Sequence, residues 1–300
     1  MNPVKTSTKS IVTSILTILC AAAFTIAIHA IMPASVDVGK LDSVLVTLFG
    51  FPIVAASYFL LLYTQCTVAV RYICSRTRVS NLQTGIRFGL SFALIYLFGM
   101  QEVIVESSPF ATYGFEYIKY QFFMGIGDAI PVFILCIVIA LFTIKSNAKE
   151  IIVHNIKMLE RLCAISIITI SFLIERTVGY ETGFIHSNCD TYTVPCYIWT
   201  VLFGMILGYI YTILYPVLFS ERKWIHVPIR FILIIGVNWI IFNSFIGLIM
   251  KGAMSNVLLR SGLDVIALFI ASCIIGRFII RDRVNKCLTD SLKFDNISLN

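Results

Sequence analysis

The sequence predicts an all-α fold, a polytopic bundle of about eight transmembrane helices, and three observations support this fold class. Hydrophobic residues make up 58% of the 300-residue chain and charged residues only 13%, whereas soluble domains carry about 25% charged residues. The mean hydropathy of the chain is +0.91. Apolar segments of about 20 residues, the length that a spanning helix requires, recur along the chain without the two-residue alternation of membrane strands.

The expected spans follow one another with short connections, and each is long enough to cross the hydrocarbon core as a helix. They are Ile11–Met32, Val44–Tyr63, Ile86–Val105, Phe122–Ile144, Leu159–Val178, Tyr197–Phe219, Ile229–Met250 and Val257–Ile280. Lys5 and Lys9 precede the first span and no small-residue cleavage site follows it, so we interpret it as an uncleaved span rather than a signal peptide. We expect residues 1–280 to form a single transmembrane domain and residues 281–300 a short cytoplasmic tail.

Short sequence matches suggest that this domain consists of two four-helix halves, residues 1–150 and 151–280. Leu48-Phe49-Gly50 recurs as Leu202-Phe203-Gly204 at the equivalent place in the second half. Parallel repeats with a binding site between the halves are a known transporter design. Short matches in apolar sequence also arise by coincidence, so both interpretations stay open.

The distribution of charge predicts the orientation of the chain. If the N-terminus is cytoplasmic, 18 of the 23 Lys and Arg residues lie on the inner side. The positive-inside rule then predicts that both termini are cytoplasmic and that the chain lies in a plasma membrane, with the bacterial inner membrane favoured. This basic side follows from topology and indicates no nucleic-acid partner. Ten of the 16 acidic residues lie on the outer side, where they could attract a small polar or cationic solute, although ordinary solvation of loops explains them too.

Four carboxylates near the outer ends of spans are candidates for a substrate or ion site. Glu102 and Glu106 are four residues apart, so on a helix they share one face. Asp128 follows Gly127 about six residues into the fourth expected span, roughly 9 Å below the outer boundary at 1.5 Å per residue. Asp264 lies at a similar depth in the eighth span. Carboxylates at such depth must be hydrated, paired or neutralised, which makes them functional candidates.

Some of these polar residues also have purely structural interpretations. Glu106 can reach the lipid headgroups, Glu175 and Arg176 can form an exposed interfacial ion pair of little energetic value, and His29 can be an ordinary interfacial helix end. Asp128 is harder to explain in this way, because its short side chain cannot reach the interface as a lysine does. We therefore expect it to face the bundle interior or a water-filled cavity, where it is protonated or paired.

The nine cysteines show no metal-binding spacing, and we expect no metal and no resident cofactor. Cys189 and Cys196 share an outer loop, where they form either a disulfide or two free thiols. The sequence contains no Gly-rich phosphate loop and no hydrolase motif. A motor driven by ATP would therefore have to come from a separate subunit.

The order of several features resembles the acyltransferase-3 family of multi-spanning membrane O-acyltransferases. The first expected helix ends in His29, and the motifs that follow it are Phe51-Pro52-Ile-Val-Ala-Ala-Ser57-Tyr58-Phe59, Ile130-Pro131-Val-Phe133 and Cys196-Tyr197-Ile-Trp-Thr-Val-Leu-Phe203-Gly204-Met-Ile-Leu-Gly208-Tyr. The resemblance implies an enzyme that moves acyl groups from an acyl donor onto extracytoplasmic glycans, with His29 as the catalytic residue. The arginine that the family carries earlier in its first helix is absent, because Ile18 stands near that place. The sequence also ends before the family's last helices.

Three classes of function follow from these observations. The first is a transporter or carrier-like protein with an outward-facing acidic site. The second is an acyltransferase-like enzyme in which His29 is the general base and a carboxylate such as Glu102 or Glu106 orients it, although the departures above put its activity in doubt. The third is a non-catalytic membrane partner, such as an immunity or assembly factor. Convergence of Asp128, Asp264 and Glu102 on one cavity would favour transport, and clustering of carboxylates around His29 would favour the enzyme.

Overall fold

The computed structural model describes residues 8–32, 43–77, 79–105, 114–143, 156–219 and 224–280. Within these ranges the chain is helical with short connections, and no β-strand forms. The elements are α1 (Thr8–Ile31), α2 (Val44–Phe49), α3 (Phe51–Cys74), α4 (Asn81–Gly99), η2 (Met100–Ile104), α5 (Gly114–Leu141), α6 (Met158–Glu181), α7 (Thr193–Leu218), α8 (His226–Phe231), η4 (Ile232–Gly236), α9 (Val237–Ile249), α10 (Ala253–Ile275) and η5 (Gly276–Ile280).

Eight stretches of these helices are long and apolar enough to cross a membrane. They are Ser10–Ile31, Phe51–Cys74, Asn81–Ile104, Phe115–Leu141, Met158–Glu181, Thr193–Leu218, His226–Ile249 and Ala253–Phe278. The predicted fold class is therefore confirmed, and the chain is a multi-pass membrane protein. The division into two four-helix halves stays a prediction.

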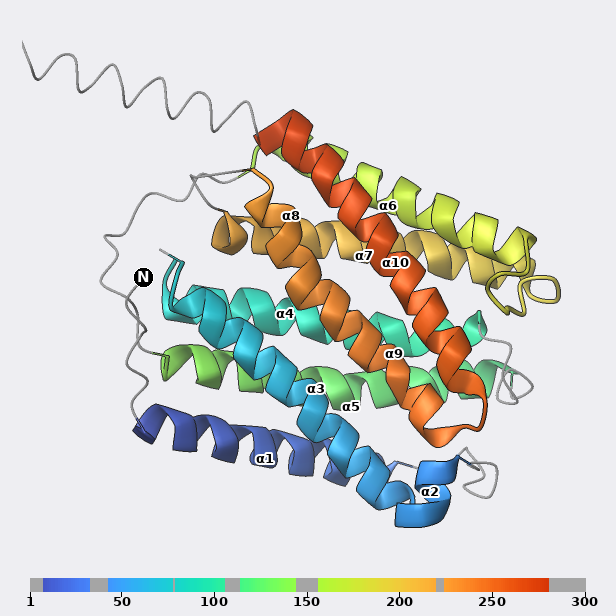
Figure 1. Ribbon diagram of the computed structural model, residues 1–300, viewed down its shortest axis with the longest axis horizontal. Helices are drawn as coiled ribbons and strands as arrows, with labels where there is room; N and C mark the ends of the chain where they lie inside the picture. The colour runs from blue at the N-terminus through green and yellow to red at the C-terminus, as the bar shows by residue number, and fades with distance from the viewer. Residues whose placement is uncertain are drawn as a thin grey trace, which may run out of the picture.

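The helices form two layers (Figure 1). α1, α5, α4, α7 and α6 lie side by side in one layer, and α3, α9 and α10 cross over it in the other. Side chains buried between the layers are mostly aromatic and aliphatic, and Trp239, Tyr96 and Phe203 are among the largest. Large apolar side chains also cover the outer faces of the helices, such as Leu61 on α3 and Ile198 on α7. Such an outer surface suits lipid rather than water.

Small residues allow neighbouring helices in the first layer to approach closely. A Cβ atom built on Gly208 of α7 would lie 2.7 Å from the Cα atom of Ile165 on α6, and one on Gly204 would lie 3.1 Å from the Cα atom of Thr169. Glycines four residues apart on one face permit this backbone contact between membrane helices. α6 and α7 are accordingly packed along much of their length.

The second expected span, Val44–Tyr63, is wrong in its limits. Residues 44–49 form the separate helix α2, which ends at Gly50 with a positive φ of 80°. α3 starts at Phe51, and Pro52 lies in its first turn. Glycine tolerates positive φ and proline favours a helix start, so the apolar run continues while the helix breaks. The spanning helix α3 then extends eleven residues beyond Tyr63, to Cys74.

The fourth span begins earlier than expected, at Gly114 rather than Phe122. Tyrosines and a lysine in its first turns hide the start from a search for apolar runs. Asp128 consequently lies fourteen residues from the start of α5, or about 21 Å along the helix axis, rather than about six residues from it. The third span also begins earlier than Ile86, at Asn81, where Ser80 caps the helix by accepting from the Gln83 amide.

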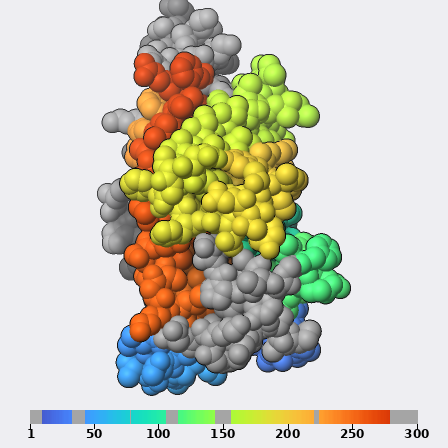
Figure 2. Space-filling model, turned by 90° about the vertical axis from the view of Figure 1, so that its right-hand side faces the viewer, coloured from blue at the N-terminus to red at the C-terminus, as the bar shows by residue number. Residues whose placement is uncertain are grey.

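One end of the bundle carries α2, the loop between α6 and α7, and the turn at Gly252 between α9 and α10; we call it the α2 end. It lies on the right in Figure 1, and Figure 2 looks onto it, with α2 in blue at the lower edge. The predicted topology would place the α2 end outside the cell. Of the two sets of ionisable side chains described below, the one that contains Glu102 and Arg176 lies toward this end, whereas the one that contains Asp128 lies at the middle of α5.

Candidate functional site

His29 and Asp128 meet where α1 packs against α5. The Nε2 atom of His29 lies 2.9 Å from Oδ1 of Asp128, and the two side chains are 20% and 5% exposed. His29 stands two residues before the end of α1, and Asp128 stands at the middle of α5. The carboxylate is therefore paired inside the bundle, as expected for an anion that cannot reach the interface.

Gly127 permits this close approach of the two helices. A Cβ atom at position 127 would lie 3.2 Å from Cδ2 and 3.3 Å from Nε2 of His29, and 3.0 Å from Cγ2 of Ile28. On another side of the imidazole, Phe59 of α3 meets it edge-on at a centroid distance of 5.6 Å. The orientation of the imidazole is thus set by α1, α3 and α5 together.

A second set of charges joins α6 to α10 and η2. Arg176 of α6 donates from Nε and Nη2 to the two carboxylate oxygens of Asp264 on α10, each at 2.6 Å. Its Nη2 atom also donates to Oε1 of Glu102 on η2, at 2.7 Å. Arg176 and Asp264 are completely buried, and Glu102 is 4% exposed. The two-pronged contact with Asp264 is the geometry that makes arginine–carboxylate pairs strong.

Residues of α9 and α10 complete this set. The Nε atom of Arg260 lies 3.1 Å from Oε1 of Glu102, and its Nη2 atom donates to Oδ1 of Asn243 at 3.4 Å. Trp239 donates from its indole Nε1 to Oδ2 of Asp264 at 2.8 Å. We call this set the Arg176 cluster; its members are Arg176, Arg260, Glu102, Asp264, Trp239 and Asn243. Its contacts connect four spanning segments, so the cluster ties the second half of the chain to the end of α4.

Aromatic rings enclose the guanidinium of Arg176. Its Cζ atom lies 5.1 Å from the ring centre of Phe172 and 5.5 Å from that of Trp199. Phe203 stacks on Trp199 and also contacts Trp239, with ring centres 5.1 and 4.7 Å apart. Contact of a cation with aromatic faces offsets part of the cost of removing it from water. The cluster therefore holds opposite charges in contact inside an aromatic shell.

The expected interfacial ion pair of Glu175 and Arg176 is wrong for the arginine. Arg176 is fully buried, and its short contacts are to Asp264 and Glu102, whereas Oε2 of Glu175 lies 3.8 Å from its Nε atom. The sequence shows only that the two residues are adjacent near a helix end. Partners from α10 and η2 bring Arg176 into the core, and their convergence depends on tertiary packing.

The structure brings together two of the four predicted carboxylates. Glu102 and Asp264 share Arg176, whereas Asp128 contacts His29 instead. Glu106 lies outside the described residues, so its expected position beside Glu102 stays a prediction. Glu102 itself stands on the tight turns of η2 rather than on a continuing α-helix.

Sequence reasoning missed three members of the Arg176 cluster, although their spacing contained a signal. Arg260 precedes Asp264 by four residues, and Trp239 precedes Asn243 by four residues, so each pair shares one helix face. Arg260 is one of the five Lys and Arg residues that the predicted topology places on the outer side. It is 1% exposed, which shows that charge counting alone cannot separate loop residues from buried ones.

Cys189 and Cys196 form a disulfide, with their Cα atoms 5.6 Å apart. The bridge closes the start of α7 onto the loop that follows α6. Of the two alternatives left open by the sequence, the structure has the bridge rather than two free thiols. Disulfides persist in oxidising compartments, so this loop is suited to the outer side of a membrane.

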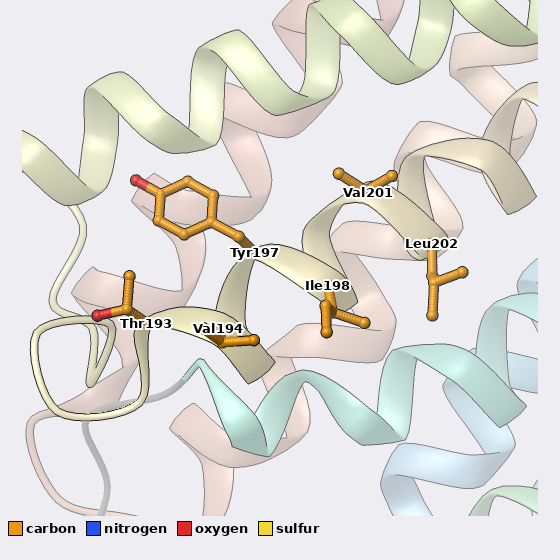
Figure 3. Close-up of a pocket in the computed structure, with 6 residues that line it drawn as sticks. All are labelled: Thr193, Val194, Tyr197, Ile198, Val201 and Leu202. Carbon is orange, nitrogen blue, oxygen red and sulfur yellow. The ribbon is translucent and has the colours of Figure 1, made fainter.

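A shallow groove of about 480 Å³ lies along the outward face of α7 (Figure 3). It is lined by Thr193, Val194, Tyr197, Ile198, Val201 and Leu202. Figure 3 shows α7 between α6 and α4, with the labelled side chains coming from α7 alone. The groove is almost wholly apolar and includes no member of the His29–Asp128 pair or the Arg176 cluster. It is therefore a surface for lipid rather than a site for chemistry.

Neither a metal centre nor a similarity to known proteins indicates what the chain does. In the described part of the chain, no group of three or more His, Cys, Asp or Glu residues is placed to hold a metal ion. No family model matches the chain, and the searches of curated proteins and of solved structures found no match to it.

Proposed function

We propose that the chain is a membrane O-acyltransferase-like enzyme in which His29 acts as general base and Asp128 orients it. The observation that carries this proposal is the 2.9 Å contact between Nε2 of His29 and Oδ1 of Asp128. A carboxylate buried beside an imidazole is a recurring arrangement in acyl transfer, because it fixes the tautomer and stabilises the imidazolium that forms. The sequence resemblance to the acyltransferase-3 family implies a role for the same histidine.

The two ring nitrogens of His29 would have different roles in acyl transfer. Nε2 of His29 faces the carboxylate and is buried, so Nδ1 is the nitrogen that can accept a proton. An acceptor hydroxyl of a glycan would give its proton to Nδ1 while its oxygen attacks the acyl carbon of the donor. The imidazolium would then return the proton to the leaving group as the donor's acyl bond breaks.

His29 is the more accessible member of the pair. His29 stands at the end of α1 and keeps a fifth of its side chain exposed, whereas Asp128 beneath it is almost fully buried. A general base must be reachable by the hydroxyl, and its orienting group need not be. If the α2 end faces outward, as the basic residues and the disulfide favour, the acceptor is an extracytoplasmic glycan.

The carrier interpretation has weaker support from the same geometry. A site for a cationic solute needs carboxylates with free lone pairs, but Glu102 and Asp264 are each within 3.1 Å of an arginine nitrogen. Asp128 does not join them. If the chain is nevertheless a carrier that couples to protons or cations through Asp128, Asp128→Asn should abolish uptake into reconstituted vesicles, and unchanged uptake would exclude that role.

The enzyme proposal is tested by replacing the base. His29→Ala should reduce acylation of surface glycans by about 10²–10⁴-fold, the usual contribution of one general base, while the amount of protein in the membrane stays unchanged. His186→Ala is the matched control, because His186 is exposed in the loop between α6 and α7. The readout is the acyl-dependent mass of glycans from cells carrying the intact gene, each variant or a deletion. Equal glycan mass in the intact and deleted strains would reject the acyltransferase proposal.

A further inference from the structure

Two arginines lie on either side of α7 at the end of the bundle opposite to the α2 end. Arg87 comes from α4 and Arg161 from α6, and α7 packs against both of these helices (Figure 3). The Nη1 atom of Arg87 donates to the backbone carbonyl of Ile213 on α7 at 2.6 Å. The Nε atom of Arg161 donates to the carbonyl of Ile156 at 3.1 Å. Each guanidinium is thus anchored on one side by a backbone carbonyl.

Ile165 of α6 packs against Gly208 of α7, and Thr169 packs against Gly204. Arg161 precedes Ile165 by one helical turn, so it lies beside the part of α7 whose Ile213 carbonyl accepts from Arg87. In the described part of the chain neither arginine takes part in an ion pair with a carboxylate. Glu160 is adjacent to Arg161 in sequence, but one of its oxygens accepts from the Lys157 amide at the start of α6. Two neighbouring cations without an acid between them favour the binding of an anion.

An apolar stripe on α7 leads from this arginine pair across the membrane. Its exposed members follow helical spacing and include Tyr209, Met205, Leu202, Ile198 and Val194, which are 47–68% exposed. From Ile213 to Val194 the helix rises about 28 Å, close to the roughly 30 Å thickness of a hydrocarbon core. The arginines therefore lie at headgroup depth of one leaflet when the α7 groove lies near the opposite interface.

We propose that Arg87 and Arg161 form a binding site for the phosphate headgroup of an anionic phospholipid, whose acyl chains lie along the exposed stripe of α7. The guanidinium groups match the charge and the acceptor oxygens of a phosphate. Basic recesses between membrane helices are a known way of holding anionic lipids. Free phosphate offers the same headgroup chemistry but nothing for the apolar stripe, so the stripe favours a lipid. This inference does not depend on the proposed enzymatic function.

Native mass spectrometry of the purified chain tests the site. The protein is titrated with phosphatidylglycerol or with phosphatidylcholine of the same acyl chains, and inorganic phosphate is added in a separate arm. We expect phosphatidylglycerol to bind more tightly than phosphatidylcholine and to resist displacement by phosphate. Equal binding of the two lipids would overturn the proposal, and displacement by equimolar phosphate would show a site for the free anion instead.

Variants separate this site from general attraction to a basic surface. Arg87→Gln with Arg161→Gln should weaken phosphatidylglycerol binding about 30-fold, because each basic residue near anionic lipid contributes a factor of about five. Arg161→Gln alone, at an exposed position, should weaken it about five-fold and keeps the test valid if the double variant folds poorly. Arg76→Gln is the control, since Arg76 is exposed on the turn after α3 and contacts the Tyr72 ring. Unchanged binding in the double variant, or an equal loss in the control, would refute the site.

Discussion

The His29–Asp128 pair and the Arg176 cluster both place charges inside the bundle, but they differ in how fully those charges are paired. In the Arg176 cluster both oxygens of Asp264 accept hydrogen bonds, and the aromatic shell leaves Arg176 no exposed surface. His29 instead makes one short contact and keeps part of its ring accessible. A closed set of pairs is suited to joining helices, whereas an imidazole with one oriented nitrogen is suited to proton transfer.

The largest expected effect on stability comes from removing Arg176 from the Arg176 cluster. Arg176→Met should lower the free energy of unfolding by about 3–5 kcal/mol, because it leaves the buried carboxylate of Asp264 without its main partner. Thermal unfolding in a mild detergent measures the change, and Arg76→Met removes an exposed arginine as the control. A loss no larger than that of the control would mean that the cluster does not hold the helices together.

The next largest expected effect is the recovery of stability when Asp264 is replaced as well. Asp264→Leu added to Arg176→Met should restore most of the lost stability, since replacing both members of a buried ion pair by apolar residues is often neutral or stabilising. Glu102 keeps its contact with Arg260 in this double variant. The same unfolding assay gives the coupling between the two sites. If the double variant were less stable than Arg176→Met alone, the cost would lie in lost packing or in the Trp239 hydrogen bond rather than in unpaired charge.

The disulfide provides a smaller effect at the α2 end and a check of orientation. Replacing Cys189 and Cys196 by serine should cost about 2 kcal/mol, because the bridge closes a short loop and constrains few conformations of the unfolded chain. In intact cells the native cysteines should resist thiol labelling until an external, impermeant reductant is added. Labelling without reduction would show that the bridge does not form, and protection from the external reductant would place the loop on the inner side.

The smallest expected effect on stability comes from replacing Gly127, which packs against His29 of the His29–Asp128 pair. Gly127→Ala should cost about 1 kcal/mol, because the new methyl group crowds Ile28 and His29 at distances to which α1 has to yield. The same displacement should reduce acyl transfer by more than this loss of stability accounts for. Gly262→Ala is the matched control, since a Cβ atom there has open space around it in α10. Equal behaviour of the two variants would show that the approach of α1 to α5 is not critical.

The fold class could be predicted because the hydrocarbon core selects long apolar helices. The breaks were harder to predict, since Gly50 interrupts a run that stays apolar on both sides. Asp128 could be selected by its depth, but its partner could not, because 99 residues separate it from His29 and only packing brings them together. Arg176 was misassigned for the same reason. Pairs within one helix, such as Arg260 and Asp264, were within reach of sequence reasoning.

The central claim is that the His29–Asp128 pair serves chemistry and the Arg176 cluster serves stability. It is tested most directly by measuring unfolding and glycan acylation on the same two variants, Asp128→Asn and Arg176→Met. Asp128→Asn keeps the shape of the side chain, so we expect it to lose about 1 kcal/mol of stability at most while acyl transfer falls by orders of magnitude. Arg176→Met should lose several times more stability, and the protein that remains folded should still transfer acyl groups. Full acylation by Asp128→Asn, or destabilisation equal to that of Arg176→Met, would contradict the account.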